Sequence, residues 1–157
     1  MSGEGAPILG VPKMRNAKIA IVSSQWHIEI CNALVEGAKR ACEEAEVAEI
    51  RIEWVPGSFE IPLASTYLLE SGYDAVVAVG LVLKGETPHF DFVCDGVTNG
   101  LMQVMLSSKK PVGFGVLMCN TLEQAIARAG LPGSTEDKGY EAANAALQML
   151  ELGGRVQ

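Results

Sequence analysis

The fold is decided by residues 75–91, which have the sequence AVVAVGLVLKGETPHFD. A continuous apolar run of strand length, such as residues 75–83, predicts a parallel strand that is covered on both faces. Gly85 permits an unusual backbone angle, and Pro88 suits the first turn of a helix. Ligands bind at the carboxyl ends of the strands in open α/β sheets. We therefore expect the polar groups that follow the run to line a ligand site, namely Glu86, Thr87 and His89.

Similar patterns divide the rest of the chain into alternating strands and helices. Apolar residues at helical spacing indicate helices, and short apolar or alternating runs indicate strands. Residues 47–55 alternate between apolar and charged side chains, which places that strand near the edge of the sheet. We expect further strands at 17–22, 47–55 and 112–119, and helices at 27–45, 58–69, 89–105, 122–129 and 140–150.

Several residues mark where the predicted helices begin and end. Gly57 or Ser58 is expected to cap the second helix. Thr121 and Gln124 have the spacing of a capping box, and Gly130 suits the end of the helix that they begin.

The order of these elements predicts a three-layer α/β/α sandwich of flavodoxin-like type. Right-handed crossovers then give a four-stranded parallel sheet with the order 2-1-3-4. Residues 17–157 are expected to form a single domain. Residues 1–16 are expected to be a flexible arm, either a disordered tail or a segment that orders against another surface. The exposed sheet edges and the apolar central helix, which carries Met102 and Met105, indicate that another subunit covers them.

Composition limits the partners and the location of the protein. The formal net charge of −7 argues against nucleic acid and anionic membranes, but it leaves room for a small phosphorylated ligand. The apolar runs are shorter than the roughly 18 residues that a membrane span needs, and no signal peptide is evident, so we expect a cytoplasmic protein. The cysteines lack metal-site spacing, and Cys31 and Cys42 would lie about 16 Å apart on one helix, so we expect reduced thiols and no metal site.

Three loops with unusual side chains follow predicted strands, at 25–27, 56–60 and 84–89, and in a parallel sheet they converge on one rim. Trp26 either packs over the sheet edge or offers a flat surface for a planar heterocycle. Glu60 either binds a ligand or simply complements the helix dipole.

Proton transfer and anion binding have separate candidates. Of the two histidines, His89 ranks above His27 for proton transfer near neutral pH, because His27 is expected to face water. The backbone N–H groups of residues 85–87 can cradle an anion, although the chain contains no P-loop. Arg128 closes the predicted fourth helix, where its charge would complement the dipole at the helix C-terminus. Lys138 opens a helix, where a cation needs compensation from an anion or from Glu136 and Asp137.

Taken together, the motifs closely resemble the 6,7-dimethyl-8-ribityllumazine synthase family, in register from about residue 17 to residue 150. They are SQWH at 24–27, VPGSFEIP at 55–62, KGETPHFD at 84–91, GVL at 115–117, EQA at 123–125 and RAG at 128–130. The resemblance implies condensation of 5-amino-6-(D-ribitylamino)uracil with 3,4-dihydroxy-2-butanone 4-phosphate, the penultimate step of riboflavin synthesis. Schiff-base formation, loss of phosphate, ring closure and dehydration would proceed without a cofactor or a metal.

The resemblance also implies roles for individual residues. It gives proton transfer to His89. The residues that would bind the pyrimidine and the ribityl chain are Trp26, Ser58, Phe59, Glu60, Leu81, Val82, Leu83 and Phe114. A neighbouring subunit would contribute Phe114. The residues that would bind the phosphate are Gly85, Glu86, Thr87, Arg128 and Lys138.

Two features depart from the usual family pattern. Glu86 stands where many relatives carry a small or neutral residue, so its backbone N–H is expected to matter more than its carboxylate. The loop from Arg128 to Lys138 is longer than in relatives that form sixty-subunit shells, which favours a homopentamer with active sites at subunit interfaces. The alternatives are a non-catalytic flavin- or lumazine-binding protein and an inactive shell protein on the same fold. The presence of Thr87, His89, Arg128 and Lys138 argues against both, because stacking alone requires none of them.

Overall fold

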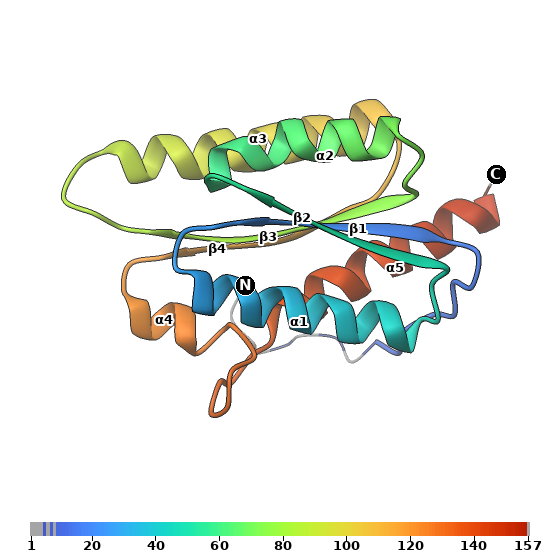
Figure 1. Ribbon diagram of the computed structural model, residues 1–157, viewed down its shortest axis with the longest axis horizontal. Coiled ribbons are helices and arrows are strands. Elements are labelled where there is room, and N and C mark those ends of the chain that lie inside the picture. The colour runs from blue at the N-terminus through green and yellow to red at the C-terminus, as the bar shows by residue number, and fades with distance from the viewer. Residues whose placement is uncertain (1–4, 6, 8, 157) are drawn as a thin grey trace.

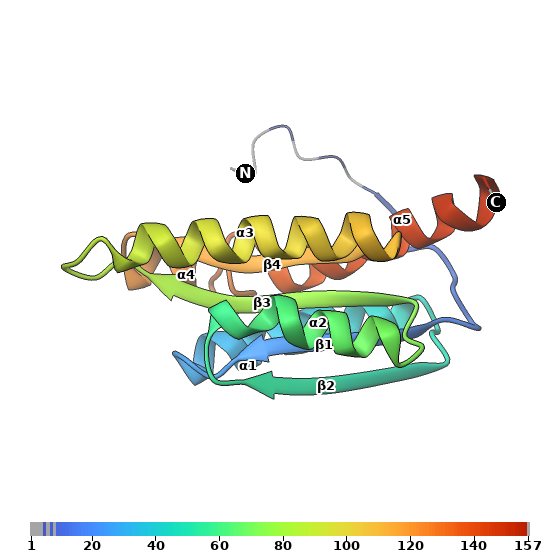
Figure 2. The same ribbon diagram turned by 90° about the horizontal axis from the view of Figure 1, so that it is seen from above.

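A computed structural model describes residue 5, residue 7 and residues 9–156 of the chain. Its four strands form one parallel sheet with the order β2-β1-β3-β4, as predicted (Figures 1 and 2). The strands are β1 Lys18–Ser24, β2 Glu49–Val55, β3 Ala75–Leu83 and β4 Val112–Cys119.

Helices cover both faces of this sheet. Figure 1 shows α2 and α3 on one face, and α1, α4 and α5 on the other, which confirms the predicted three-layer flavodoxin-like architecture. The α-helices are α1 Ile28–Glu44, α2 Ile61–Glu70, α3 His89–Ser108, α4 Leu122–Ile126 and α5 Lys138–Val156, and a short 3₁₀ helix, η1 Ser58–Glu60, precedes α2.

The strand β3 lies between β1 and β4 and is buried on both faces, as its apolar sequence predicts. Val77 and Val79 pack in the core beneath α1 and α5, whereas Val76 and Ala78 pack on the opposite side with residues of α2 and α3. At one edge, β2 pairs only with β1 among the described strands, in agreement with its alternating pattern. The sheet therefore has a firm centre from which the loop after β3 emerges.

The helices α1 and α5 approach each other so closely that glycine is required between them. A Cβ atom on Gly139 would lie 2.0 Å from the backbone oxygen of Leu34, which cannot move without displacing α1. We expect Gly139→Ala to lower the free energy of unfolding by at least about 2 kcal/mol, because the added methyl group overpacks a backbone contact. Thermal or urea unfolding measures the change.

Gly153→Ala is the matched control, because Gly153 lies in the same helix and a Cβ atom there meets nothing within 4 Å. Alanine has a higher helix propensity than glycine, so Gly153→Ala should raise the free energy of unfolding by up to about 1 kcal/mol. Equal stability of the two variants would contradict the close approach of α1 and α5.

Some predicted helix boundaries are wrong. The predicted second helix is divided into η1 and α2, and Gly57 occupies the N-cap position of η1 without a side-chain cap. The predicted fourth helix ends at Ile126 rather than at residue 129, so Arg128 lies beyond it. Pro88 precedes α3 at its N-cap position instead of lying within the first turn. Each error concerns one turn, where local hydrogen bonds outweigh propensity.

The predicted capping box at α4 forms only in part. Thr121 Oγ1 accepts a hydrogen bond from Gln124 N at 3.4 Å, as expected. The Gln124 side chain, however, accepts from Asn120 N at 2.8 Å instead of from the backbone of Thr121. The reciprocal half of the box is therefore displaced by one residue, and Gly130 still adopts a left-handed conformation with φ of 74°.

Part of the predicted N-terminal arm, residues 1–4, 6 and 8, lies outside the described residues. The segment that follows runs along α5: the backbone oxygens of Leu9 and Gly10 accept hydrogen bonds from Asn144 Nδ2 and Gln148 Nε2. All four cysteines are unpaired, as predicted. Within the described chain, every helix is too short or too polar to cross a lipid bilayer.

Candidate active site

A cavity of about 590 Å³ opens at the carboxyl ends of β1 and β3. All three loops singled out from the sequence contribute to its wall, which confirms that they converge on one rim of the sheet. The lining residues are Trp26, His27, Gly57, Ser58, Phe59, Glu60, Leu81, Val82, Leu83, Lys84, Gly85, His89 and Val93. The volume suits a single heterocyclic ligand with a short polar chain.

The base of the cavity is apolar apart from one hydroxyl group. Leu81 and Val82 are buried near the end of β3 and line the cavity. Ser58 is only 6% exposed, and its Oγ has no hydrogen-bond partner among the described residues. A buried hydroxyl that lacks a partner is costly, and a polar ligand group would relieve that cost.

Gly80 makes room for hydroxyl groups beneath the cavity. A Cβ atom at Gly80 would lie 2.7 Å from Ser24 Oγ and 3.1 Å from Ser58 Oγ. Both distances are too short for an ordinary contact, so any larger residue would displace these serines. The absence of a side chain at Gly80 therefore positions Ser58 at the cavity base.

Trp26, Glu60 and Gly57 form one side of the opening. The Trp26 side chain is 67% exposed, so it does not pack over the sheet edge. A Cβ atom on Gly57 would lie 3.1 Å from Glu60 Oε2 and 3.6 Å from Trp26 Nε1, which shows that both side chains approach this glycine. An open indole next to a carboxylate can stack on a planar ring while the carboxylate accepts hydrogen bonds from ligand hydroxyls.

Phe59 lies farther along the same loop and packs across α3. A Cβ atom on Gly96 would lie 2.6 Å from Phe59 Cε2, so the ring rests on the α3 backbone while remaining 60% exposed. Phe59 also contributes to the cavity wall.

His89 is the first residue of α3, and its exposed side chain lines the cavity. Gly85 also lines it, whereas Glu86 and Thr87 are exposed nearby and lie outside the set of lining residues. The free N–H groups at the start of α3 favour a negatively charged group beside this turn. An imidazole and an anion-binding turn therefore share one end of the cavity.

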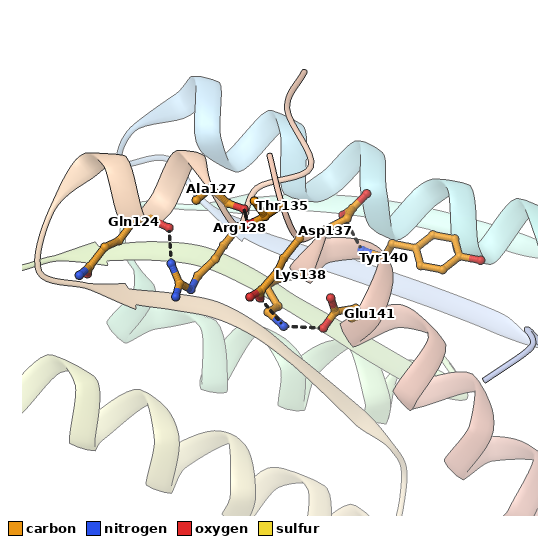
Figure 3. A network of polar contacts seen from close by, with 9 residues as sticks. Gln124, Ala127, Arg128, Thr135, Asp137, Lys138, Tyr140 and Glu141 are labelled. Atoms are coloured by element: carbon orange, nitrogen blue, oxygen red, sulfur yellow. Dashed lines mark hydrogen bonds and ion pairs between the residues drawn. The ribbon is translucent and has the colours of Figure 1, made fainter. Parts of the chain in front are cut away.

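Arg128 and Lys138, the two predicted phosphate cations, lie outside the cavity lining of the single chain (Figure 3). Arg128 lies in the loop between α4 and α5, and Lys138 is the first residue of α5. Arg128 Nη1 donates to the backbone oxygen of Gln124 at 2.9 Å, which is the dipole-complementing role considered for it from the sequence. Burial raises the pKa of the thiol of Cys119, the last residue of β4, and the positive charge of Arg128 opposes that increase.

Lys138 is held between two carboxylates. Its Nζ lies 2.6 Å from oxygens of Glu136 and Glu141, and its side chain is 18% exposed. Burial lowers the pKa of Lys138, but hydrogen bonds to the two carboxylates outweigh burial and raise that pKa. The predicted need for a compensating anion is therefore met by Glu136 and by Glu141. Asp137 acts elsewhere: it accepts a hydrogen bond from Tyr140 N at 3.0 Å and pairs with Arg40.

Phe114 is 45% exposed on β4 and also lies outside the cavity lining. One chain thus brings together His89, Gly85 and the predicted pyrimidine and ribityl residues other than Phe114. It leaves Phe114, Arg128 and Lys138 apart.

The profile of the 6,7-dimethyl-8-ribityllumazine synthase family matches residues 16–153. The chain belongs to this family. A 6,7-dimethyl-8-ribityllumazine synthase of Streptomyces coelicolor is 52% identical over 147 residues, covering 94% of this chain and 91% of that protein. The synthase of Streptomyces avermitilis has the same identity and coverage, and that of Paenarthrobacter aurescens is 51% identical over 152 residues, covering 94% of each chain.

The cavity of this lumazine synthase family member is also lined by residues that were not predicted from the sequence, namely Gly57, Lys84 and Val93. Gly57 and Lys84 lie within the three loops, but neither carries a side chain that distinguishes a ligand contact from a turn or surface residue. Val93 follows His89 by one helical turn, so helical spacing from His89 would have identified it.

Proposed function

We propose that this protein condenses 5-amino-6-(D-ribitylamino)uracil with 3,4-dihydroxy-2-butanone 4-phosphate to give 6,7-dimethyl-8-ribityllumazine, phosphate and water. The observation that carries the proposal is the single cavity in which an open indole, a buried serine hydroxyl and a histidine converge. Family membership supplies the chemistry that this cavity would perform.

In this proposal the pyrimidine stacks on Trp26 and lies along the backbone of residues 81–83. Glu60 accepts hydrogen bonds from ribityl hydroxyls, and Ser58 gives its buried hydroxyl a partner on the ligand. Holding two substrates in register supplies much of the acceleration in such a condensation, because it replaces a bimolecular encounter with an oriented one. Phe59 closes the side of the cavity next to α3.

The second substrate places its phosphate beside the turn formed by Gly85, Glu86 and Thr87, where backbone N–H groups at the start of α3 face the anion. His89 moves protons during Schiff-base formation and phosphate loss. The Glu86 carboxylate takes no part in phosphate binding in this proposal, since it would repel the anion. The exposed position of Glu86 supports this assignment.

The remaining charge would come from a neighbouring subunit. We propose a homopentamer in which Phe114 and Arg128 of one chain complete the cavity of the next. Support comes from the position of both residues outside the cavity of their own chain, where Phe114 is exposed and Arg128 half-buried. The long loop between residues 128 and 138, which resembles that of pentameric members, supports it as well. Lys138 supports the conformation of the loop and does not bind the phosphate directly, because its ammonium group already pairs with Glu136 and Glu141. The four unpaired thiols agree with a cytoplasmic location.

Mixing the two substrates with the purified protein tests the proposal directly. Lumazine absorbance and phosphate should rise together in equal amounts. A flavin-binding protein on the same fold would bind lumazine or flavin tightly and release no phosphate, and that result would overturn the proposed reaction. Light scattering or native mass spectrometry on the same sample reports whether the assembly is a pentamer.

A further inference from the structure

The turn between β1 and α1, residues 25–27, carries Trp26 to the cavity and has little local support. We call these residues the Trp26 turn. His27 adopts a left-handed conformation with φ of 54°, which is unfavourable for a residue with a side chain. His27 occupies the N-cap position of α1 but makes no side-chain capping hydrogen bond. The indole is 67% exposed, so packing does not fix it either.

Two hydrogen bonds anchor the backbone of this turn. Gln25 N donates to the backbone oxygen of Val55 at 3.1 Å, which extends the pairing of β1 with β2. On the other side, Cys31 Sγ lies 3.0 Å from the backbone oxygen of Trp26 and donates to it. The backbone N–H groups of Ile30 and Cys31 donate to the backbone oxygen of His27, and not to that of Trp26. Among the described residues, the Cys31 thiol is therefore the donor that reaches the Trp26 carbonyl.

The environment of Cys31 keeps its thiol in the donor form. Cys31 is 0% exposed. Burial raises the pKa of the thiol, against smaller opposing effects of hydrogen bonds from Ser24 and Ser23. Ser24 Oγ lies 3.6 Å from Cys31 Sγ, and it is the donor of that pair, because the thiol proton is directed to Trp26. Gly80 of β3 provides the space that the Ser24 hydroxyl occupies. A continuous set of contacts thus connects the centre of the sheet to the Trp26 turn.

We propose that Cys31 is a positioning residue that holds Trp26 in its stacking position through the hydrogen bond from its thiol to the Trp26 carbonyl. The proposal rests on the proposed function only in taking Trp26 as the surface on which the pyrimidine stacks. Without the thiol, the Trp26 turn keeps its left-handed residue and the hydrogen bond of Gln25 N, but it loses the hydrogen bond to the Trp26 carbonyl. The indole then samples other orientations, and the pyrimidine binds less tightly.

Kinetics of Cys31→Ala, with Cys42→Ala as the control, test this role. Cys42 lies in the same helix, is also 0% exposed and makes no side-chain hydrogen bond in the described part of the chain. Both variants remove a buried sulfur atom, so packing losses are matched. Loss of one hydrogen bond should raise the KM for the pyrimidine about fivefold in Cys31→Ala only, with kcat and the KM for the phosphate substrate little changed. Equal effects of the two variants, or none in either, would overturn the proposal.

A second measurement does not require catalysis. The chain has two tryptophans, so Trp54→Phe leaves Trp26 as the single emitter. In that background, Cys31→Ala should lower the fluorescence anisotropy of Trp26, and Cys42→Ala should not. Cys31→Ser should restore anisotropy and KM, because serine retains a donor. Unchanged anisotropy in Cys31→Ala, or a serine variant equal to the alanine variant, would reject the role of the thiol. Absence of lumazine formation by the wild-type protein would count against the proposed reaction alone.

Discussion

Replacing His89 with alanine is expected to lower kcat by roughly 10- to 100-fold, at or below the usual contribution of a general acid–base group. The loss is limited because the cavity still holds both substrates in register. His89 lies at the start of α3 with an exposed side chain, so its removal should leave the fold intact. Steady-state rates of lumazine formation at saturating substrate concentrations measure the change.

The matched comparison is His27→Asn. His27 is the only other histidine of the chain and also lines the cavity, and asparagine tolerates its left-handed backbone. The His89 variant should lose far more kcat than the His27 variant, while KM for both substrates changes little. If kcat of His89→Ala equals that of the wild type, His89 has no part in the reaction.

The sheet and the cavity rim could be predicted because their evidence is local in sequence. The apolar run at residues 75–83 determines a buried strand, and the residues after each strand must then meet at one rim. Helix ends were less predictable, because a single side chain decides them. The Gln124 amide illustrates this: it accepts from Asn120 rather than Thr121, a difference of one residue that no sequence pattern specifies.

The environment of buried polar groups was not predictable in the same way. The unpartnered Ser58 hydroxyl and the hydrogen bond from Cys31 to Trp26 depend on how β3, β1 and α1 pack together. From the sequence, Ser58 had two uses, a helix cap or a ligand contact, and Cys31 was only a buried thiol. Such roles become visible once burial and distances identify which donors and acceptors lack a partner.

Lys138 shows that a cation identified in the sequence is not always free to bind a ligand in the folded protein. As a cation at the end of the long loop, it resembled a helper for the phosphate. Its position between Glu136 and Glu141 makes the local net charge negative (Figure 3). Arg128 is then the cation of this network that pairs with no carboxylate in the part of the chain that the structure describes. In the proposed reaction, we therefore expect phosphate binding by this loop to depend on Arg128.

Arg128→Ala is accordingly expected to raise the KM for 3,4-dihydroxy-2-butanone 4-phosphate by roughly 10- to 100-fold, since hydrogen bonds between charged groups are the strong ones. Affinity for the pyrimidine should stay within about twofold, because Trp26, Ser58 and Glu60 are unaffected. The guanidinium group donates only to the Gln124 carbonyl among the described residues, so it can turn toward a phosphate at small cost. Initial rates at varied concentrations of each substrate separate the two effects.

Two variants make the Arg128 result specific. Arg51→Ala removes the same charge from a surface ion pair with Glu53 on β2, and it should leave both KM values unchanged. Arg128→Lys should recover only part of the loss, because lysine keeps the charge but lacks the planar fork that matches phosphate oxygens. Mixing Arg128→Ala chains with His89→Ala chains adds a further test. If Arg128 acts in the cavity of a neighbouring chain, mixed assemblies contain some cavities with both residues intact and regain activity, whereas an arginine that serves its own chain gives no recovery.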